Sequence, residues 1–205
     1  MRFSTEGIAN CRTPDVPEWF LGLRPDVQLL SDLGNASVPP EQRARMFTSY
    51  VSGYFKHRSI TSRKFEDLKM ELTDEIRTST TDRMTEDEYN SAINSGPIAR
   101  SDILHATVSG AEFKTYALRA LFDDEMAHKY WPALSVDVIW CEHSLWQCVN
   151  SGWEYQNLRE EFDKKGVAGR PLRVFMLPGA NHFVSIFPVN FIWMRLLTRF
   201  EATLG

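Results

Sequence analysis

Two short apolar runs in the last third of the chain predict buried strands. Residues 136–140 read Val-Asp-Val-Ile-Trp, and residues 173–177 read Arg-Val-Phe-Met-Leu. Both runs are rich in β-branched or large apolar side chains, and Gly and Pro flank the second, as is typical of strands in a parallel sheet. Residues 145–165 have apolar positions spread along a helix, with Gly166 placed to end it. The order strand, helix, strand predicts an α/β fold with two parallel strands.

The middle of the chain has the spacing of amphipathic helices. Apolar side chains recur three and four apart over residues 40–56 and again over residues 62–76. Residues 85–88 and 109–112 each have the Thr/Ser-x-x-Glu pattern of a capping box, which opens a helix. We therefore expect a helical layer over residues 38–130.

The first segment, residues 1–37, is broken by proline and glycine and predicts irregular structure. The chain is thus expected to have three parts: this segment, the helical layer over residues 38–130, and an α/β unit over residues 131–205. Two parallel strands cannot bury their own edges. We expect the rest of the sheet to lie outside this sequence, or a partner or second copy of the chain to cover the edge.

Composition narrows the class of protein. At 205 residues and 43% hydrophobic, the chain is long and apolar enough for one domain with a sizeable core, which argues against disorder. No apolar run predicts a membrane span, and the net charge of -4 with mixed signs has no basic stripe for nucleic acid. The first residues lack the pattern of a secretory signal, and the three cysteines have no histidine at zinc-ligand spacing. The sequence therefore predicts a cytoplasmic protein without a metal.

The strongest candidate for chemistry is His182. The turn at Pro178-Gly179 places it just past the carboxyl end of the second predicted strand, where open α/β sheets hold their sites. The chain here runs from the strand through Pro-Gly-Ala-Asn-His-Phe to a helix opened by Pro188. This order resembles the end of an α/β-hydrolase, whose last strand presents the catalytic histidine. Residues 136–144 resemble that family's penultimate strand and acid loop, so the resemblance covers roughly residues 98–205.

The resemblance implies a partial α/β-hydrolase fold, with a helical cap before its last two strands. It also implies an esterase-like activity on a small apolar or ester substrate, with His182 as the base and with no cofactor or metal. The family's Gly-x-Ser-x-Gly nucleophile motif is absent from the sequence. We therefore expect a truncated serine hydrolase that is inactive as the isolated chain. The alternative is a non-catalytic binding or scaffolding module derived from a hydrolase.

The triad acid is left open by the sequence. Ser144 stands where the family pattern has aspartate, and a serine cannot stabilise an imidazolium. Glu142 on the same predicted loop is the nearest substitute, although a solvated loop carboxylate is an equally good interpretation. Asp137 lies inside the strand and is a weaker candidate. Some relatives place the acid after the preceding strand, which is expected to lie outside this sequence. Cys148 is predicted to be a buried structural thiol, and His57 falls in a helical pattern.

Overall fold

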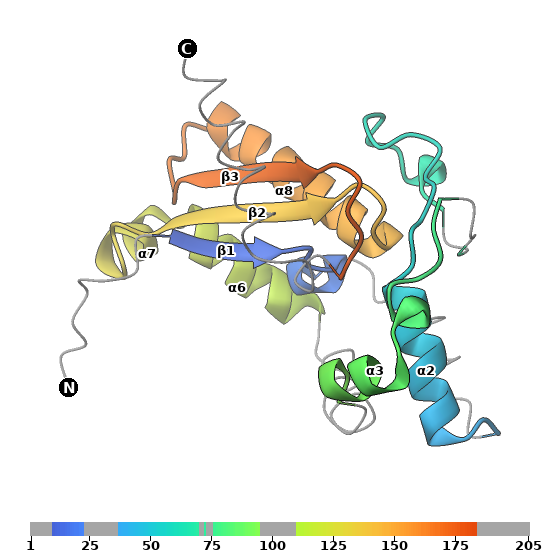
Figure 1. The fold of residues 1–205 in the computed structure, drawn as a ribbon. Coiled ribbons are helices and arrows are strands. Elements are labelled where there is room, and N and C mark those ends of the chain that lie inside the picture. Colours follow the sequence, from blue (N-terminus) through green and yellow to red (C-terminus); the bar gives the residue numbers. More distant parts are fainter. Residues whose placement is uncertain (1–9, 23–36, 70–71, 73–75, 95–109, 184–205) are drawn as a thin grey trace, which may run out of the picture.

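A parallel sheet organises the chain. The computed structural model describes all residues except 1–9, 23–36, 70–71, 73–75, 95–109 and 184–205. Its strands are β1 (Asn10–Pro14), β2 (Ser135–Cys141) and β3 (Leu172–Leu177), in the spatial order β1-β2-β3. Both pairings are parallel, and the arrows in Figure 1 point the same way. The prediction of an α/β protein with two parallel strands late in the chain is confirmed.

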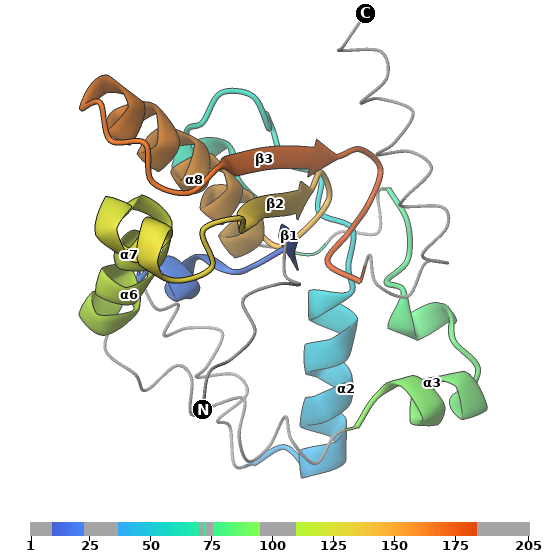
Figure 2. The same cartoon turned by 90° about the vertical axis from the view of Figure 1, so that its left-hand side faces the viewer.

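The described helices lie against one face of the sheet and beyond the ends of its strands. The α-helices are α2 (Pro40–Val51), α3 (Glu86–Ala92), α6 (Gly110–Phe122), α7 (Asp124–Lys129) and α8 (Trp146–Lys164). The described residues also form the short 3-10 helices η1 (Glu18–Leu21), η2 (Phe65–Asp67) and η3 (Thr81–Arg83). Figures 1 and 2 both place α2 and α3 toward the carboxyl ends of the strands and α7 near their amino ends. No helix in the described part of the chain is long and apolar enough to cross a membrane.

Alternation along β2 divides the core between the two faces of the sheet. Val138 packs with residues of α6 and α8, and Trp140 packs with α8. The alternate residues, Ile139 and Cys141, cluster on the opposite face with the end of β3. Gly152 in α8 allows close approach, because a Cβ there would lie 2.3 Å from Cδ1 of Trp140. Helix α8 is thus seated directly on the central strand.

Helix-end signals in the sequence are confirmed where the structure describes them. Thr85 and Glu88 form a reciprocal capping box at the start of α3. Gly166 has a φ of 70° after α8, a conformation that glycine adopts without strain. The capping box predicted at Ser109 and the helix predicted after Pro188 lie outside the described residues.

Two predictions about local structure are wrong. The segment predicted to be irregular contains β1, so the sheet gains a third strand from within the chain. The helix predicted over residues 62–76 is absent from residues 62–69, apart from the single turn η2. There, the Ser62 amide donates to the Ser59 hydroxyl, the Ser62 hydroxyl accepts from the Lys64 amide, and Arg63 has a φ of 54°. These local bonds compete with helix formation.

Candidate functional site

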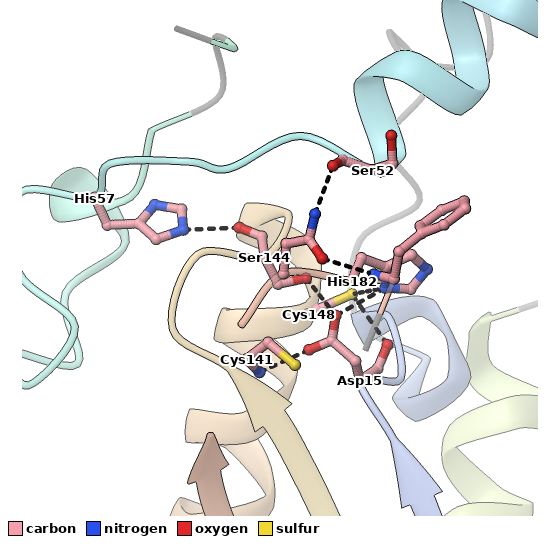
Figure 3. Close-up of polar contacts among 9 residues, drawn as sticks. Asp15, Ser52, His57, Cys141, Ser144, Cys148 and His182 are labelled. Carbon is pink, nitrogen blue, oxygen red and sulfur yellow. Dashed lines mark hydrogen bonds and ion pairs between the residues drawn. The ribbon is translucent and has the colours of Figure 1, made fainter. Parts of the chain in front are cut away.

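Loops from all three strands meet at the carboxyl edge of the sheet. Asp15 directly follows β1, Ser144 lies in the loop after β2, and His182 lies in the loop after β3. Because the strands are parallel and adjacent, these loops come together although they are far apart in sequence. Figure 3 shows their side chains converging.

The central contact joins a carboxylate to an imidazole. Nδ1 of His182 lies 2.8 Å from Oδ2 of Asp15. An ionised carboxylate only accepts hydrogen bonds, so Nδ1 carries the proton. In the neutral imidazole, Nε2 then has a free lone pair, and it has no hydrogen-bond partner among the described residues. The His182 side chain is 27% exposed, whereas that of Asp15 is 1% exposed.

Asp15 is held by several donors at once. Its Oδ1 accepts the backbone N–H of Cys141 at 2.8 Å, and its Oδ2 accepts the hydroxyl of Ser144 as well as the imidazole. Buried carboxylates need such donors, because loss of hydration is otherwise not compensated. The backbone of Asp15 has a φ of 49°, which is uncommon for a residue other than glycine and which clusters at functional sites. The carboxylate is therefore fixed in position and orientation.

Cys148 completes the cluster without being set up as a nucleophile. Its Sγ lies 3.5 Å from Nδ1 of His182 and donates to the backbone carbonyl of Asp15 at 3.2 Å. Burial and the neighbouring Asp15 carboxylate raise the pKa of this thiol well above its usual value. The thiolate needed for nucleophilic attack is thus disfavoured, in agreement with a structural thiol.

The side chains of Asp15, Cys148 and His182 are of the kinds that commonly bind metal ions. One ligand atom from each of Asp15, Cys148 and His182 lies within 4.8 Å of the others. Metal binding requires a thiolate and a free imidazole nitrogen. Here the raised pKa of the thiol opposes the first, and the nitrogen that faces the other two side chains, Nδ1, carries the proton bonded to Asp15. The geometry fits a hydrogen-bonded cluster better than a ligand set.

The carboxylates singled out from the sequence lie elsewhere. Oε2 of Glu142 accepts the backbone N–H of Gly179 at 2.8 Å, which ties the loop after β2 to the turn after β3. Asp137 pairs with Arg173 through contacts of 2.7 and 2.9 Å. The carboxylate at the imidazole is Asp15, which sequence reasoning missed. Its only signal was weak: an aspartate before Val-Pro, after five residues with no apolar run.

The chain after α2 covers the loop after β2. The Phe55 N–H donates to the carbonyl of His143 at 3.0 Å, and Nε2 of His57 donates to the carbonyl of Ser144 at 2.9 Å. Nδ1 of His57 accepts the Lys69 N–H at 3.0 Å, so both ring nitrogens are bonded in the neutral form. Burial lowers the pKa of His57 accordingly. His57 therefore lies beyond the end of α2, whereas its sequence pattern had predicted a position within a helix.

The arrangement is suited to proton transfer at Nε2 of His182. A carboxylate on Nδ1 fixes the tautomer, orients the ring and stabilises the imidazolium that forms when Nε2 takes up a proton. The site geometry alone therefore indicates a general base. Comparisons with protein-family models, with curated proteins and with solved structures find no match to this chain.

Proposed function

We propose that Asp15 and His182 are the acid and the base of an α/β-hydrolase-type site that hydrolyses an ester or similar acyl bond. The observation that carries the proposal is the 2.8 Å contact between Oδ2 of Asp15 and Nδ1 of His182 at the carboxyl edge of a parallel sheet. In the reaction, Nε2 takes the proton of an attacking hydroxyl and passes it to the leaving group. Water then repeats the cycle, while Asp15 stabilises the imidazolium.

The topology supports this proposal. Three adjacent parallel strands in sequence order, with a long helical segment between the first and second, fit the last three strands and the cap of the resembling family. Asp15 then occupies the place that some relatives use for the acid, after the strand before the cap. Ser144, at the more common acid position, donates its hydroxyl to the carboxylate that replaces it. Glu142, the acid proposed from the sequence, has instead a bond to Gly179 that suits a loop tie.

The nucleophile in this proposal lies outside the 205 residues, since they contain no Gly-x-Ser-x-Gly motif. The isolated chain is then a fragment that does not hydrolyse esters. The substrate class is a small apolar or ester compound, and no cofactor or metal takes part. A cytoplasmic location belongs to the same proposal, and the free thiols of Cys11, Cys141 and Cys148 suit a reducing compartment.

The test is labelling of the native protein. The protein is captured from its source with an antibody against this chain and treated with a fluorophosphonate, which reacts with activated serines. We expect a labelled species whose mass is well above 23.6 kDa. Labelling is lost in His182→Ala but kept in His128→Ala, a change at a histidine of helix α7 whose Nδ1 bonds the Asp124 carbonyl of the same helix. A native protein of 23.6 kDa that resists labelling would contradict the proposal.

A second candidate function is a non-catalytic binding or scaffolding module. The observation in its favour is that β1 and β3 each pair only with β2 within the described residues, so both edges of the sheet are available to a strand from a partner or from another copy. An unlabelled native protein that elutes as a homo-oligomer or with a stoichiometric partner would favour this module over the enzyme.

A further inference from the structure

A buried polar cluster lies between the helical layer and the loop that carries His182. Its members come from α2, from the region of η3 and from the loop after β3, and each is less than a tenth exposed. They are Thr48, Ser52, Thr80, Thr81 and Asn181. Buried polar groups destabilise a fold unless they are hydrogen-bonded, so such a cluster has one favoured arrangement.

Asn181 is the member that belongs to the histidine loop. It is completely buried and immediately precedes His182. Its Nδ2 donates to the backbone carbonyl of Ser52 at 2.5 Å and to Oγ1 of Thr80 at 2.9 Å, and its Oδ1 accepts the Phe183 N–H at 3.2 Å. The amide thus holds the chain on both sides of His182 and ties it to the helical layer.

The acceptors of this amide are themselves fixed. The Ser52 carbonyl also accepts the Thr80 N–H at 3.0 Å, and the Ser52 hydroxyl accepts the Thr81 N–H at 3.1 Å. The Ser52 N–H continues the ladder of α2 by donating to the Thr48 carbonyl at 3.0 Å. The end of α2 and the start of η3 are therefore one hydrogen-bonded unit, and Asn181 is anchored to it (Figure 3 shows the Ser52 side of this contact).

We propose that Asn181 is a positioning residue, which holds the imidazole of His182 against Asp15 by anchoring its loop to the helical layer. The inference rests on the proposed function, because it assigns Asn181 a role for the base. The Nδ1 to Oδ2 distance is 2.8 Å, and N–H···O bonds lengthen to about 3.2 Å at most. A loop shift of about half an ångström therefore weakens the contact that sets the tautomer.

The test measures the imidazole of His182 directly, so it needs no nucleophile. The 205-residue chain is labelled with 15N-histidine, and the His182 signals are assigned by their loss in His182→Gln. The ring nitrogen shifts give the tautomer, and solvent exchange gives the lifetime of the Nδ1 proton. In the wild type we expect the Nδ1–H tautomer with a slowly exchanging proton.

Asn181→Leu keeps approximate size and removes all three bonds. We expect the Nδ1 proton of His182 to exchange about tenfold faster or more, and the Nε2–H tautomer to become populated. Thr80→Val removes only one acceptor and is the milder variant in case the first does not fold. It should accelerate exchange by about threefold.

Tyr89→Phe is the matched control. It removes a buried bond of 2.9 Å between the Tyr89 hydroxyl and Oγ1 of Thr48, within the same helical layer but away from the loop. It should lower the melting temperature without altering the His182 signals. If Asn181→Leu and Thr80→Val behave as Tyr89→Phe does, the positioning role is overturned while the base assignment stands. If the wild type already has the Nε2–H tautomer, the proposed function fails as well.

Discussion

Replacing Asp15 by asparagine separates the charge of this side chain from its shape. Oδ1 faces the Cys141 N–H, while Oδ2 faces the Ser144 hydroxyl and Nδ1 of His182. The asparagine amide has one oxygen and one NH₂ group. An NH₂ group directed at the Cys141 N–H would bring two donors together in a buried site, so the oxygen remains there. The NH₂ group then faces His182, whose Nδ1 must become an acceptor.

The main consequence is a change of tautomer. His182 takes the Nε2–H form, in which Nε2 can no longer accept a proton from a nucleophile. Stability changes far less. The three bonds to Asp15 each weaken by about 0.5–1.5 kcal/mol when the charge is removed. The cost of burying that charge, several kcal/mol, disappears at the same time. We expect the free energy of unfolding to change by about 2 kcal/mol or less.

The assay combines urea unfolding with the 15N shifts of the His182 ring in Asp15→Asn. The matched control is Asp137→Asn, because Asp137 is equally buried but pairs with Arg173 on the sheet. Only Asp15→Asn should convert His182 to the Nε2–H tautomer. In a protein that also contains the nucleophile, the same change should lower kcat by about 10³ to 10⁴. A folded Asp15→Asn protein that keeps the Nδ1–H tautomer would refute the reasoning.

Three further predictions concern the structure around the site. The pKa of His57 is lowered by burial, so its contribution to stability is complete above about pH 6.5 and is lost as the pH falls through the lower pKa of the folded state. Melting temperatures from about pH 7.5 to 5 should show this loss in the wild type and a smaller one in His57→Gln. Gly152→Ala should cost about 1–3 kcal/mol in urea unfolding, because the new Cβ meets Trp140, and unchanged stability would disprove that packing. Arg170→Met should lower the free energy of unfolding by about 2–4 kcal/mol, because the buried guanidinium donates to the Ala120 and Trp131 carbonyls at 2.8 Å. Amide exchange in α7 should accelerate with it.

Elements with strong local signals could be predicted from the sequence. Strands β2 and β3 are apolar on both faces, and Gly166 marks the end of α8. The same signals placed His182 at a strand end. Each of these features depends on residues close together in the chain, which is why the pattern was sufficient.

Elements stabilised by distant residues could not be predicted. The residues of β1 have no apolar run, and the strand forms because its backbone pairs with β2 from Asn10↔Ser135 to Pro14↔Ile139. Asp15 was missed for the same reason, because its position follows from that pairing. The helix predicted over residues 62–76 is wrong for a different reason. The apolar residues there do have helical spacing, but serine side chains and the positive φ of Arg63 favour turns.

The pairing of β1 with β2 also sets the order of events during synthesis. Asp15 leaves the ribosome 167 residues before His182, and the pairing of β1 with β2 cannot form until β2 has followed. At about 5–20 residues per second, this interval is roughly 10–30 s. Closing so long a loop is entropically costly and makes such contacts slow to form. The contact between Asp15 and His182 therefore forms only after the residues between them have been synthesised, long after β1 itself has emerged.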